Sequence, residues 1–319
     1  MTPTTKSRGV FLADVLVNEA ICDEHYRMIL DLAAFPETAP GQFVQVMCRG
    51  DESTVEPRVL EWTDDALPKL TGAELTANEP MLRRPISLAG RRTHGGGRVE
   101  LDLIYRVVGR GTRWLSTVTS GATMSLLGPL GNAFTIHPDR PHAAVIGGGV
   151  GIPPMLYLSE ALAASGKHTV AFAGARTASM LPLRLLPAGT VETSGAPTHS
   201  VAEFAAFGVD TSVATDDGSL GLHGTVGAGF ERWLDAEAIE PAALAVYTCG
   251  PEGLMRAIAE ICGARGIACE VSLERTMACG MGTCQSCVCK TKAPTEQGWA
   301  YRLCCTDGPV FPAADVIWT

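Results

Sequence analysis

The 319-residue sequence has few aromatic residues, few charges and no basic excess, and each scarcity excludes a class of protein. Aromatic residues make up 6% of the chain and charged residues 18%. Lysine and arginine number 25 against 34 aspartates and glutamates, which gives a net charge of −9. Such a balance offers no basic surface for nucleic acid or for an anionic membrane, so neither is expected as a partner.

Long apolar runs are also missing, although a membrane-spanning helix needs about 18 or more apolar residues. The best candidate, residues 143–158, is interrupted by four glycines and two prolines. Near the N-terminus, the apolar patch Val10–Ala13 ends at Asp14, before it reaches the length of a signal-peptide core. These features predict a cytoplasmic protein.

Glycine and proline are plentiful instead, with 35 and 20 residues. The secondary structure predicted between the turns that they form changes along the chain. Up to about residue 138, short β-rich runs separated by turns predict an antiparallel β-barrel. Residues 139–270 alternate strands with helices, which predicts an α/β domain with a parallel sheet. Residues 271–319 return to turn-rich sequence. Residues 49–80 are acidic and weakly periodic, and we expect them to form an insertion in the barrel.

The chain has eleven cysteines, and seven of them lie from Cys269 onward. An odd number gathered at one end does not indicate a disulfide framework, whereas closely spaced thiolates in a cytosolic protein indicate metal ligands. Cys279, Cys284 and Cys287 follow the C-x4-C-x2-C spacing of plant-type [2Fe–2S] ferredoxins, which require a fourth and more distant cysteine.

The fourth ligand has two candidates, Cys304 and Cys305. Adjacent residues of an extended chain point to opposite sides, so only one of the two faces a cluster readily, and the spacing alone leaves the choice open. Zinc is an alternative occupant, although it usually takes two separated C-x2-C pairs. Inert buried thiols are another alternative, although a glycine-rich loop is poor core material.

A buried strand, a glycine-rich turn and a helix that opens with proline occupy residues 143–154. Such a turn directs free backbone N–H groups at a phosphate. The turn differs from the G-x-G-x-x-G fingerprint, because it has no glycine in the last position and no acidic residue about twenty positions on. A later strand ends at the same sheet edge, where α/β proteins bind ligands. The candidate nucleotide contacts are Gly147, Gly148, Gly149, Gly151, Cys249, Gly250 and Pro251.

Two segments of the barrel region, Arg84–Ser87 and Ile104–Arg106, combine arginine with polar neighbours, and the second is followed by Gly-x-Gly-Thr ending at Thr112. An arginine beside a proline-fixed turn, with a hydroxyl close by, suits a pyrophosphate and the polar edge of a flavin ring. Without further context, such segments are more often basic surface turns.

The order of these motifs resembles that of ferredoxin-NADP reductase-like flavoproteins. The ordered motifs are Arg84–Ser87, the turn ending at Thr112, Leu127–Asn132, the glycine run from Gly147 and Cys249–Pro251. With the cysteine loop behind them, they resemble the electron-transfer subunits of dihydroorotate dehydrogenase B over nearly the whole chain.

The resemblance implies an FAD-binding β-barrel domain over residues 1–138, an NAD-binding α/β domain over 139–270 and a [2Fe–2S] domain over 271–319. It also implies Cys305 as the fourth ligand, because the last cysteine of the family precedes x-Asp-Gly-Pro-Val-Phe, as here before Phe311. The implied flavin contacts are Arg84, Pro85, Ile86, Ser87, Ile104, Tyr105, Arg106, Gly111 and Thr112.

The function implied by the resemblance is electron transfer in pyrimidine biosynthesis. An FMN-containing catalytic subunit would oxidise dihydroorotate, and this chain would pass the electrons through [2Fe–2S] and FAD to NAD+, in an assembly of two copies of each subunit. No catalytic acid or base is assigned to this chain. Residues 49–80 depart from the family pattern, which puts partner contacts near them in doubt.

Two other functions remain open at this point. The small subunit of an NADH-dependent ferredoxin:NADP oxidoreductase or of a sulfide dehydrogenase carries the same motifs. A zinc-bearing interaction protein without flavin is an alternative of another class. NADP is also open as the nucleotide, with Arg176 as a candidate contact for its 2′-phosphate.

Overall fold

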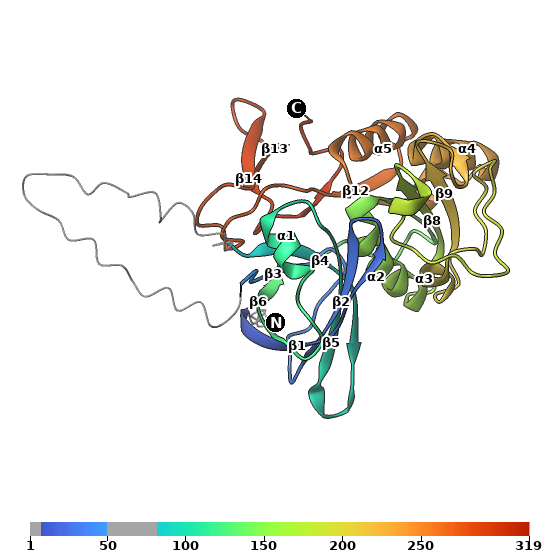
Figure 1. Cartoon of the computed structure of the whole chain (residues 1–319). Coiled ribbons are helices and arrows are strands. Elements are labelled where there is room, and N and C mark those ends of the chain that lie inside the picture. Colours follow the sequence, from blue (N-terminus) through green and yellow to red (C-terminus); the bar gives the residue numbers. More distant parts are fainter. Residues whose placement is uncertain (1–7, 50–81, 319) are drawn as a thin grey trace, which may run out of the picture.

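The computed structural model describes residues 8–49 and 82–318 (Figure 1). The expected insertion at 49–80 lies, apart from Arg49, outside the described residues. In the described part, the barrel lies beside a larger α/β sheet, and the cysteine-rich segment packs against both (Figure 1). No helix of the described residues is long and apolar enough to cross a membrane.

Six antiparallel strands close the barrel in the order β1-β2-β5-β4-β3-β6, as the sequence predicts. Alternating side chains such as Met28 and Leu30 of β2 fill its interior, because successive residues of a strand point to opposite faces. One short helix, α1, follows β5. The elements are β1 (Gly9–Cys22), β2 (His25–Leu32), β3 (Phe43–Val46), β4 (Arg84–Thr93), β5 (Val99–Arg106), α1 (Arg110–Leu115) and β6 (Thr123–Leu130).

The second part is a seven-stranded sheet in the order β10-β9-β8-β7-β11-β12-β15. Its first six strands are parallel, which confirms the predicted α/β architecture. Helices α2 and α3 cover one face, and α4 and α5 cover the other. The elements are β7 (His142–Gly148), α2 (Ile152–Ala164), β8 (His168–Ala175), α3 (Ala202–Ala205), β9 (Asp210–Thr215), β10 (Leu222–His223), α4 (Val226–Glu237), β11 (Leu244–Cys249), α5 (Glu252–Arg265) and β12 (Ala268–Ser272).

The C-terminal segment contains a hairpin and one strand that returns to the large sheet. The hairpin pairs β13 (Val288–Lys292) with β14 (Trp299–Leu303), and β15 (Val310–Pro312) pairs antiparallel with β12. Its buried side chains share a core with Phe43 and Leu130 of the barrel and Met255 of α5. This common core fixes the cysteine loop at the corner where the barrel meets the α/β domain.

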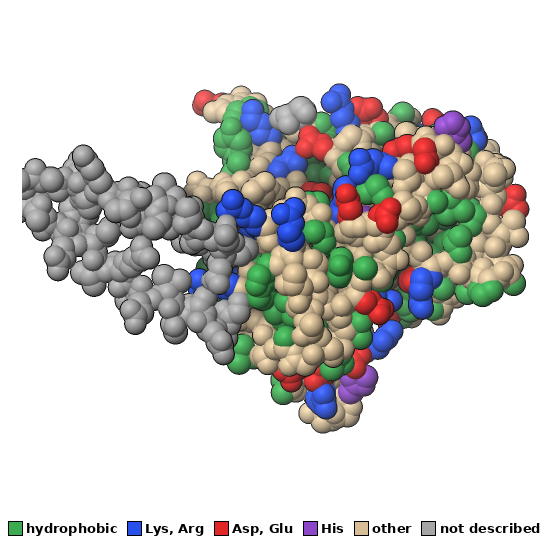
Figure 2. Space-filling view, in the orientation of Figure 1, with side chains coloured by type: hydrophobic (Ala, Val, Ile, Leu, Met, Phe, Trp, Pro, Cys, Tyr) green, Lys and Arg blue, Asp and Glu red, His purple; other side chains and the backbone are tan. Residues whose placement is uncertain are grey.

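Acidic and basic side chains are interspersed on the face of the molecule shown in Figure 2. That face presents no continuous basic patch of the kind that binds nucleic acid.

Candidate cofactor sites

A cavity of about 460 Å³ lies where the barrel, the α/β domain and the cysteine-rich segment meet. Most of the predicted flavin residues line it. They are Arg84, Pro85, Ile86, Ser87, Ile104, Tyr105, Arg106 and Thr112 from the barrel, joined by Cys249 from the end of β11. Segments far apart in the sequence therefore converge on one space that is large enough for a substantial part of a dinucleotide.

The two predicted strand segments present different atoms to this cavity. The side chain of Ile86 belongs to the barrel core, and so does that of Tyr105, whose hydroxyl donates to Asn18 Oδ1 at 2.9 Å. Because neighbouring residues of a strand alternate, Pro85, Ser87 and Arg106 face the opposite way. Ile86 and Tyr105 are thus placed to offer mainly their backbone to a ligand.

Three arginines and one glutamate, Glu274, line the cavity. Arg106 is paired with Glu24, and Arg275 with Glu252, but Arg84 donates to the carbonyl oxygens of Leu82 and Arg83. Among the described residues, Arg84 has no carboxylate partner within ion-pair distance. Its charge is available for an anionic ligand such as a pyrophosphate.

The loop before α1 packs against the Arg84 side chain. The Thr112 hydroxyl accepts hydrogen bonds from the N–H groups of Val108 and Gly109, at 2.9 and 3.1 Å, which caps the start of α1. Gly111 does not line the cavity, but a Cβ there would lie 2.7 Å from Arg84 Nε. The absence of a side chain at Gly111 therefore lets Arg84 occupy its place.

A second cavity, of about 330 Å³, lies at the carboxyl edge of the parallel sheet. Of the predicted nucleotide residues, Gly148, Gly149 and Pro251 line it. Arg106 lines both this cavity and the first, so the two spaces adjoin. Arg176, the candidate contact for a 2′-phosphate, also lines the second cavity.

Gly147, Gly151 and Gly250 lie behind this surface, in close packing contacts. A Cβ on Gly151 would lie 2.1 Å from the carbonyl oxygen of Cys249, and one on Gly147 would lie 2.8 Å from the Cα of Ile152. These glycines let the two loops at the sheet edge approach each other. Burial and the nearby Glu274 raise the pKa of the Cys249 thiol, which therefore stays protonated at neutral pH.

The cysteine loop wraps backbone N–H groups around one thiol. The N–H groups of Met281 and Cys284 both lie 3.4 Å from Cys279 Sγ. Cys284 is exposed, and hydrogen bonds from the side chain and backbone of Ser286 lower its pKa to about 6. Cys287 is buried beneath the loop. A loop whose N–H groups converge on sulfur suits thiolate ligands and the sulfides of an iron–sulfur cluster.

The adjacent cysteines at the end of β14 have different neighbours. Burial and the Cys287 thiol raise the pKa of Cys305 to about 12, which places Cys305 against the cysteine loop. The pKa of Cys304 is raised mainly by a hydrogen bond with Cys289, a residue of β13 inside the common core. Cys305 thus has the thiols of Cys287 and Cys279 as neighbours, whereas the main thiol neighbour of Cys304 is Cys289.

In the part of the chain that the structure describes, no three His, Cys, Asp or Glu side chains converge as they would around a single metal ion. A two-iron cluster makes a different demand, because four thiolates are shared between two irons that sulfides bridge. The pairs Cys279 with Cys284 and Cys287 with Cys305 are neighbours. The donor set is therefore compatible with a [2Fe–2S] cluster.

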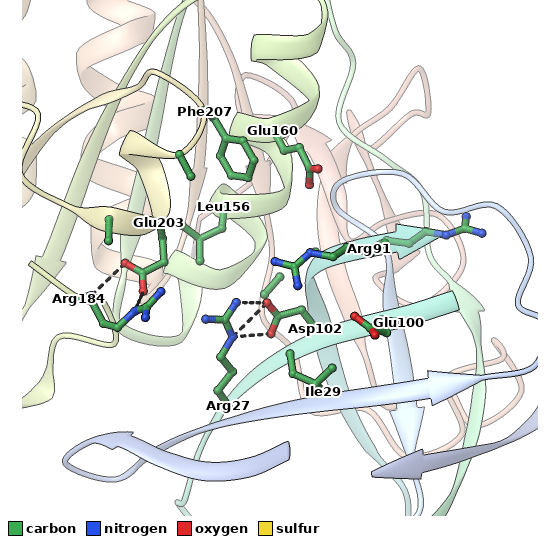
Figure 3. A pocket seen from close by; sticks show the side chains of 15 residues that line it. Arg27, Ile29, Arg91, Glu100, Asp102, Leu156, Glu160, Arg184, Glu203 and Phe207 are labelled. Atoms are coloured by element: carbon green, nitrogen blue, oxygen red, sulfur yellow. Dashed lines mark hydrogen bonds and ion pairs between the residues drawn. The ribbon is translucent and has the colours of Figure 1, made fainter. Parts of the chain in front are cut away.

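Figure 3 shows a third space, a charged cleft of about 180 Å³ between the barrel and helices α2 and α3. Arg27 pairs with Asp102 there, and Arg184 pairs with Glu203 at 3.0 Å. Its four arginines are matched by four carboxylates, so the cleft offers little net charge to a ligand. The arginines are Arg27, Arg91, Arg92 and Arg184, and the carboxylates are Glu100, Asp102, Glu160 and Glu203.

Sequence reasoning missed the far wall of the first cavity. Ser272, Leu273, Glu274, Arg275, Met277 and Pro309 line it, and Phe43 and Val150 complete it. The sequence did single out Pro309, because it lies in the Asp-Gly-Pro segment after Cys305 that matches the family pattern. Residues 273–277, which follow β12, belong to no helix or strand and carry no motif, and only the folded structure brings them to the cavity.

The cysteine-rich segment matches a family model described as the iron-sulfur cluster binding domain of dihydroorotate dehydrogenase B, over residues 274–317. The chain is 38% identical over 241 residues to the dihydroorotate dehydrogenase B (NAD(+)), electron transfer subunit, of Bacillus caldolyticus, which covers 75% of this chain and 81% of that protein. A relative of the same name from Desulforamulus reducens is 31% identical over 312 residues, covering 97% and 98%.

Solved structures share the fold at lower identity. A structure of an NADH-dependent reduced ferredoxin-NADP oxidoreductase gives a TM-score of 0.69 at 22% identity, covering 100% of this chain and 92% of that one. A ferredoxin reductase in carbazole 1,9a-dioxygenase gives a TM-score of 0.57 at 18% identity, covering 83% and 68%. The first of these likenesses shows that the fold it shares with this chain extends over all three parts of the chain.

Proposed function

The chain belongs to the family of electron-transfer subunits of dihydroorotate dehydrogenase B, and on this premise we propose that it passes electrons to NAD+ from a partner subunit that oxidises dihydroorotate. It is an oxidoreductase subunit with a ferredoxin reductase-like fold and an iron–sulfur domain. The cofactors of the proposal are a [2Fe–2S] cluster and FAD, with NAD as the exchanged nucleotide. The partner contains FMN.

One observation carries this proposal, namely the composition of the wall around the 460 Å³ cavity. Barrel residues such as Arg84 line it beside Val150 and Cys249 of the α/β domain and Met277 and Pro309 of the cysteine-rich segment. A cofactor held in this cavity is adjacent to both the proposed nucleotide site and the cysteine-rich segment. That is the arrangement that a carrier between a cluster and a nicotinamide requires.

We assign FAD to this cavity. When bound, FAD links the one-electron chemistry of a cluster to the hydride chemistry of a nicotinamide. Arg84 supplies positive charge for the pyrophosphate, and Ser87 and the backbone of the two strands supply polar contacts to the flavin. The remaining proposed contacts are Pro85, Ile86, Ile104, Tyr105, Arg106, Gly111 and Thr112.

We assign NAD to the second cavity. Gly148 and Gly149 present backbone without side chains to the nucleotide beside the ring of Pro251, and Gly147, Gly151 and Gly250 allow the close packing behind it. The protonated thiol of Cys249 faces the flavin cavity, where it closes the boundary between the two sites without adding charge.

We assign the cluster to Cys279, Cys284, Cys287 and Cys305. The N–H groups around Cys279 Sγ and the orientation of Cys305 toward Cys287 support this set. We further propose the domain limits 1–138, 139–270 and 271–319, with the last strand returning to the sheet of the second domain. The reduced thiols that such a cluster needs support a cytoplasmic location, and we propose two copies of each subunit in the assembly.

Co-expression with an FMN-bearing dihydroorotate dehydrogenase subunit tests the function. The expected result is a stable complex that reduces NAD+ with dihydroorotate, whereas this chain alone oxidises NADH with artificial acceptors and does not act on dihydroorotate. Binding to a ferredoxin-NADP or sulfide-linked partner instead would move the function to that class of enzyme. A purified chain without visible absorption from flavin or cluster would favour the zinc-bearing alternative.

A further inference from the structure

Gln45 occupies the barrel strand that contacts both the flavin cavity and the cysteine loop. It lies in β3, where it pairs with Pro85 of the arginine–proline motif. Phe43, two residues earlier on the same face of the strand, lines the flavin cavity. The Gln45 side chain does not line that cavity. It therefore lies one step further along the strand, toward the cysteine loop.

The carboxamide of Gln45 is buried and unpartnered. The residue is 0% exposed, and within the described residues neither Nε2 nor Oε1 has a hydrogen-bond partner. A buried amide that leaves both of its polar atoms unpaired is strongly unfavourable, and native proteins pair such groups with protein, water or ligand. The carboxamide thus indicates a polar partner that does not belong to the described chain.

The carboxamide lies directly against the cysteine loop. A Cβ on Gly280 would be 2.7 Å from Gln45 Nε2 and 3.2 Å from its amide carbon. Gly280 follows the proposed ligand Cys279 and has φ +70°, so it supplies both the turn and the space for this contact. Cys279 Sγ, on the residue before Gly280, and the sulfides of a bound cluster would bring acceptors to this loop.

A second glutamine three residues away provides a comparison. Gln42 is also buried, at 3% exposed, but both polar atoms of its amide have a backbone partner. Its Nε2 donates to the carbonyl oxygen of Gly131 and its Oε1 accepts from the N–H of Ala39, both at 3.0 Å. Of these two buried glutamines, Gln42 therefore has hydrogen bonds to its side-chain amide and Gln45 has none among the described residues.

We propose that Gln45 is a positioning residue that donates a hydrogen bond to a sulfur of the cluster and thereby raises the reduction potential of the cluster. This inference rests on the proposed function, because it assumes the cluster at Cys279, Cys284, Cys287 and Cys305. A donor to sulfur stabilises the reduced cluster, which carries the additional negative charge, more than the oxidised one. Gln45 would thus adjust the electron supply to the flavin that is bound further along the same face of its strand.

The test is an EPR-monitored redox titration of the loaded protein with Gln45→Met, which keeps an unbranched side chain and removes the donor. At a fixed applied potential, the ratio of reduced to oxidised cluster should fall about tenfold, because one hydrogen bond to a charged acceptor is lost. A tenfold change in this ratio corresponds to a shift of about 59 mV in the reduction potential of a one-electron couple. Gln45→Leu, of different shape, should shift the potential in the same direction.

Gln42→Met is the matched control. It breaks two backbone hydrogen bonds, so its melting temperature should fall by several degrees while the cluster potential stays at the wild-type value. If Gln45→Met and Gln45→Leu kept the wild-type potential at full iron content, Gln45 would be satisfied by water or by the loop backbone, and the inference would be wrong. A wild-type protein without an EPR-active [2Fe–2S] cluster would instead reject the proposed function.

Discussion

Cys304 and Cys305 are neighbours in sequence, yet Cys305 faces Cys287 and Cys304 faces Cys289. We expect Cys305→Ser to lose most of the cluster iron, because a hydroxyl replaces a thiolate ligand. Cys304→Ser should keep the iron, at some loss of stability, because it places a hydroxyl in an apolar core. Iron and sulfide analysis after anaerobic purification measures both. Full iron in Cys305→Ser together with loss in Cys304→Ser would reverse the ligand assignment.

Arg84 is the arginine of the flavin cavity whose charge is free of carboxylates among the described residues. Its replacement in Arg84→Ala should weaken FAD binding by about ten- to a hundredfold, since a charge-assisted hydrogen bond contributes about 1.5–3 kcal/mol. Arg92→Ala is the control, because Arg92 lies on the same strand β4 but lines the charged cleft. Flavin fluorescence during dialysis measures the affinity, and equal retention by both variants would contradict the proposed role of Arg84.

Individual residues of the flavin site were predictable where a motif fixes them to a strand. Arg84 to Ser87 and Ile104 to Arg106 reach the cavity because β4 and β5 carry them there. Which of them point into the barrel was not predicted, although strand alternation separates Tyr105 from Arg106. Glu274 and Met277 carry no motif, so their part in the cavity depends on packing between distant segments.

At the scale of elements, the turn between β7 and α2 requires close approach of two loops. Gly151→Ala would place a methyl group 2.1 Å from the carbonyl oxygen of Cys249. We expect a loss of about 1–3 kcal/mol in the free energy of unfolding, as for other overpacked sites, together with weaker NAD binding. Chemical unfolding and NADH titration measure the two effects.

Gly263→Ala is the control for that substitution. Gly263 lies in the exposed part of α5, and nothing lies within 4 Å of a Cβ placed there. Alanine is the better helix former, so this variant should be more stable by about 0.5–1 kcal/mol with NAD binding unchanged. Equal stability changes in both glycine variants would mean that the packing at the sheet edge is looser than the structure shows.

Elements with strong periodicity were predicted, and short ones that depend on distant partners were not. The buried strand and the proline-opened helix predicted within residues 143–154, observed as β7 and α2, follow from apolar pattern and turn residues. Strand β15 spans only Val310–Pro312, which is too short to show a hydrophobic periodicity. It forms because it pairs with the edge of β12, about forty residues earlier in the sequence. Its antiparallel pairing at the edge of a parallel sheet is therefore a tertiary effect.

At the scale of the molecule, the order of motifs predicted the three parts and their cofactors, but not how the parts meet. The cysteine-rich segment is fixed by a core that includes Phe43, Met255 and Phe311, one residue from each part. No local pattern encodes such a core, because its members Phe43 and Val316 are separated by 273 positions in sequence (316 minus 43). That core holds the cysteine loop against β3 and brings Pro309 to the flavin cavity.

The most direct test is an anaerobic titration of the complex with its FMN-bearing partner, followed by EPR and visible absorption. Dihydroorotate, added without NAD+, should bleach the flavins and produce the EPR signal of a reduced [2Fe–2S] cluster. Subsequent NAD+ should abolish that signal and yield NADH, and dihydroorotate should produce no signal with this chain alone. A cluster that stays oxidised with dihydroorotate, or stays reduced after NAD+ is added, would contradict electron transfer through this chain.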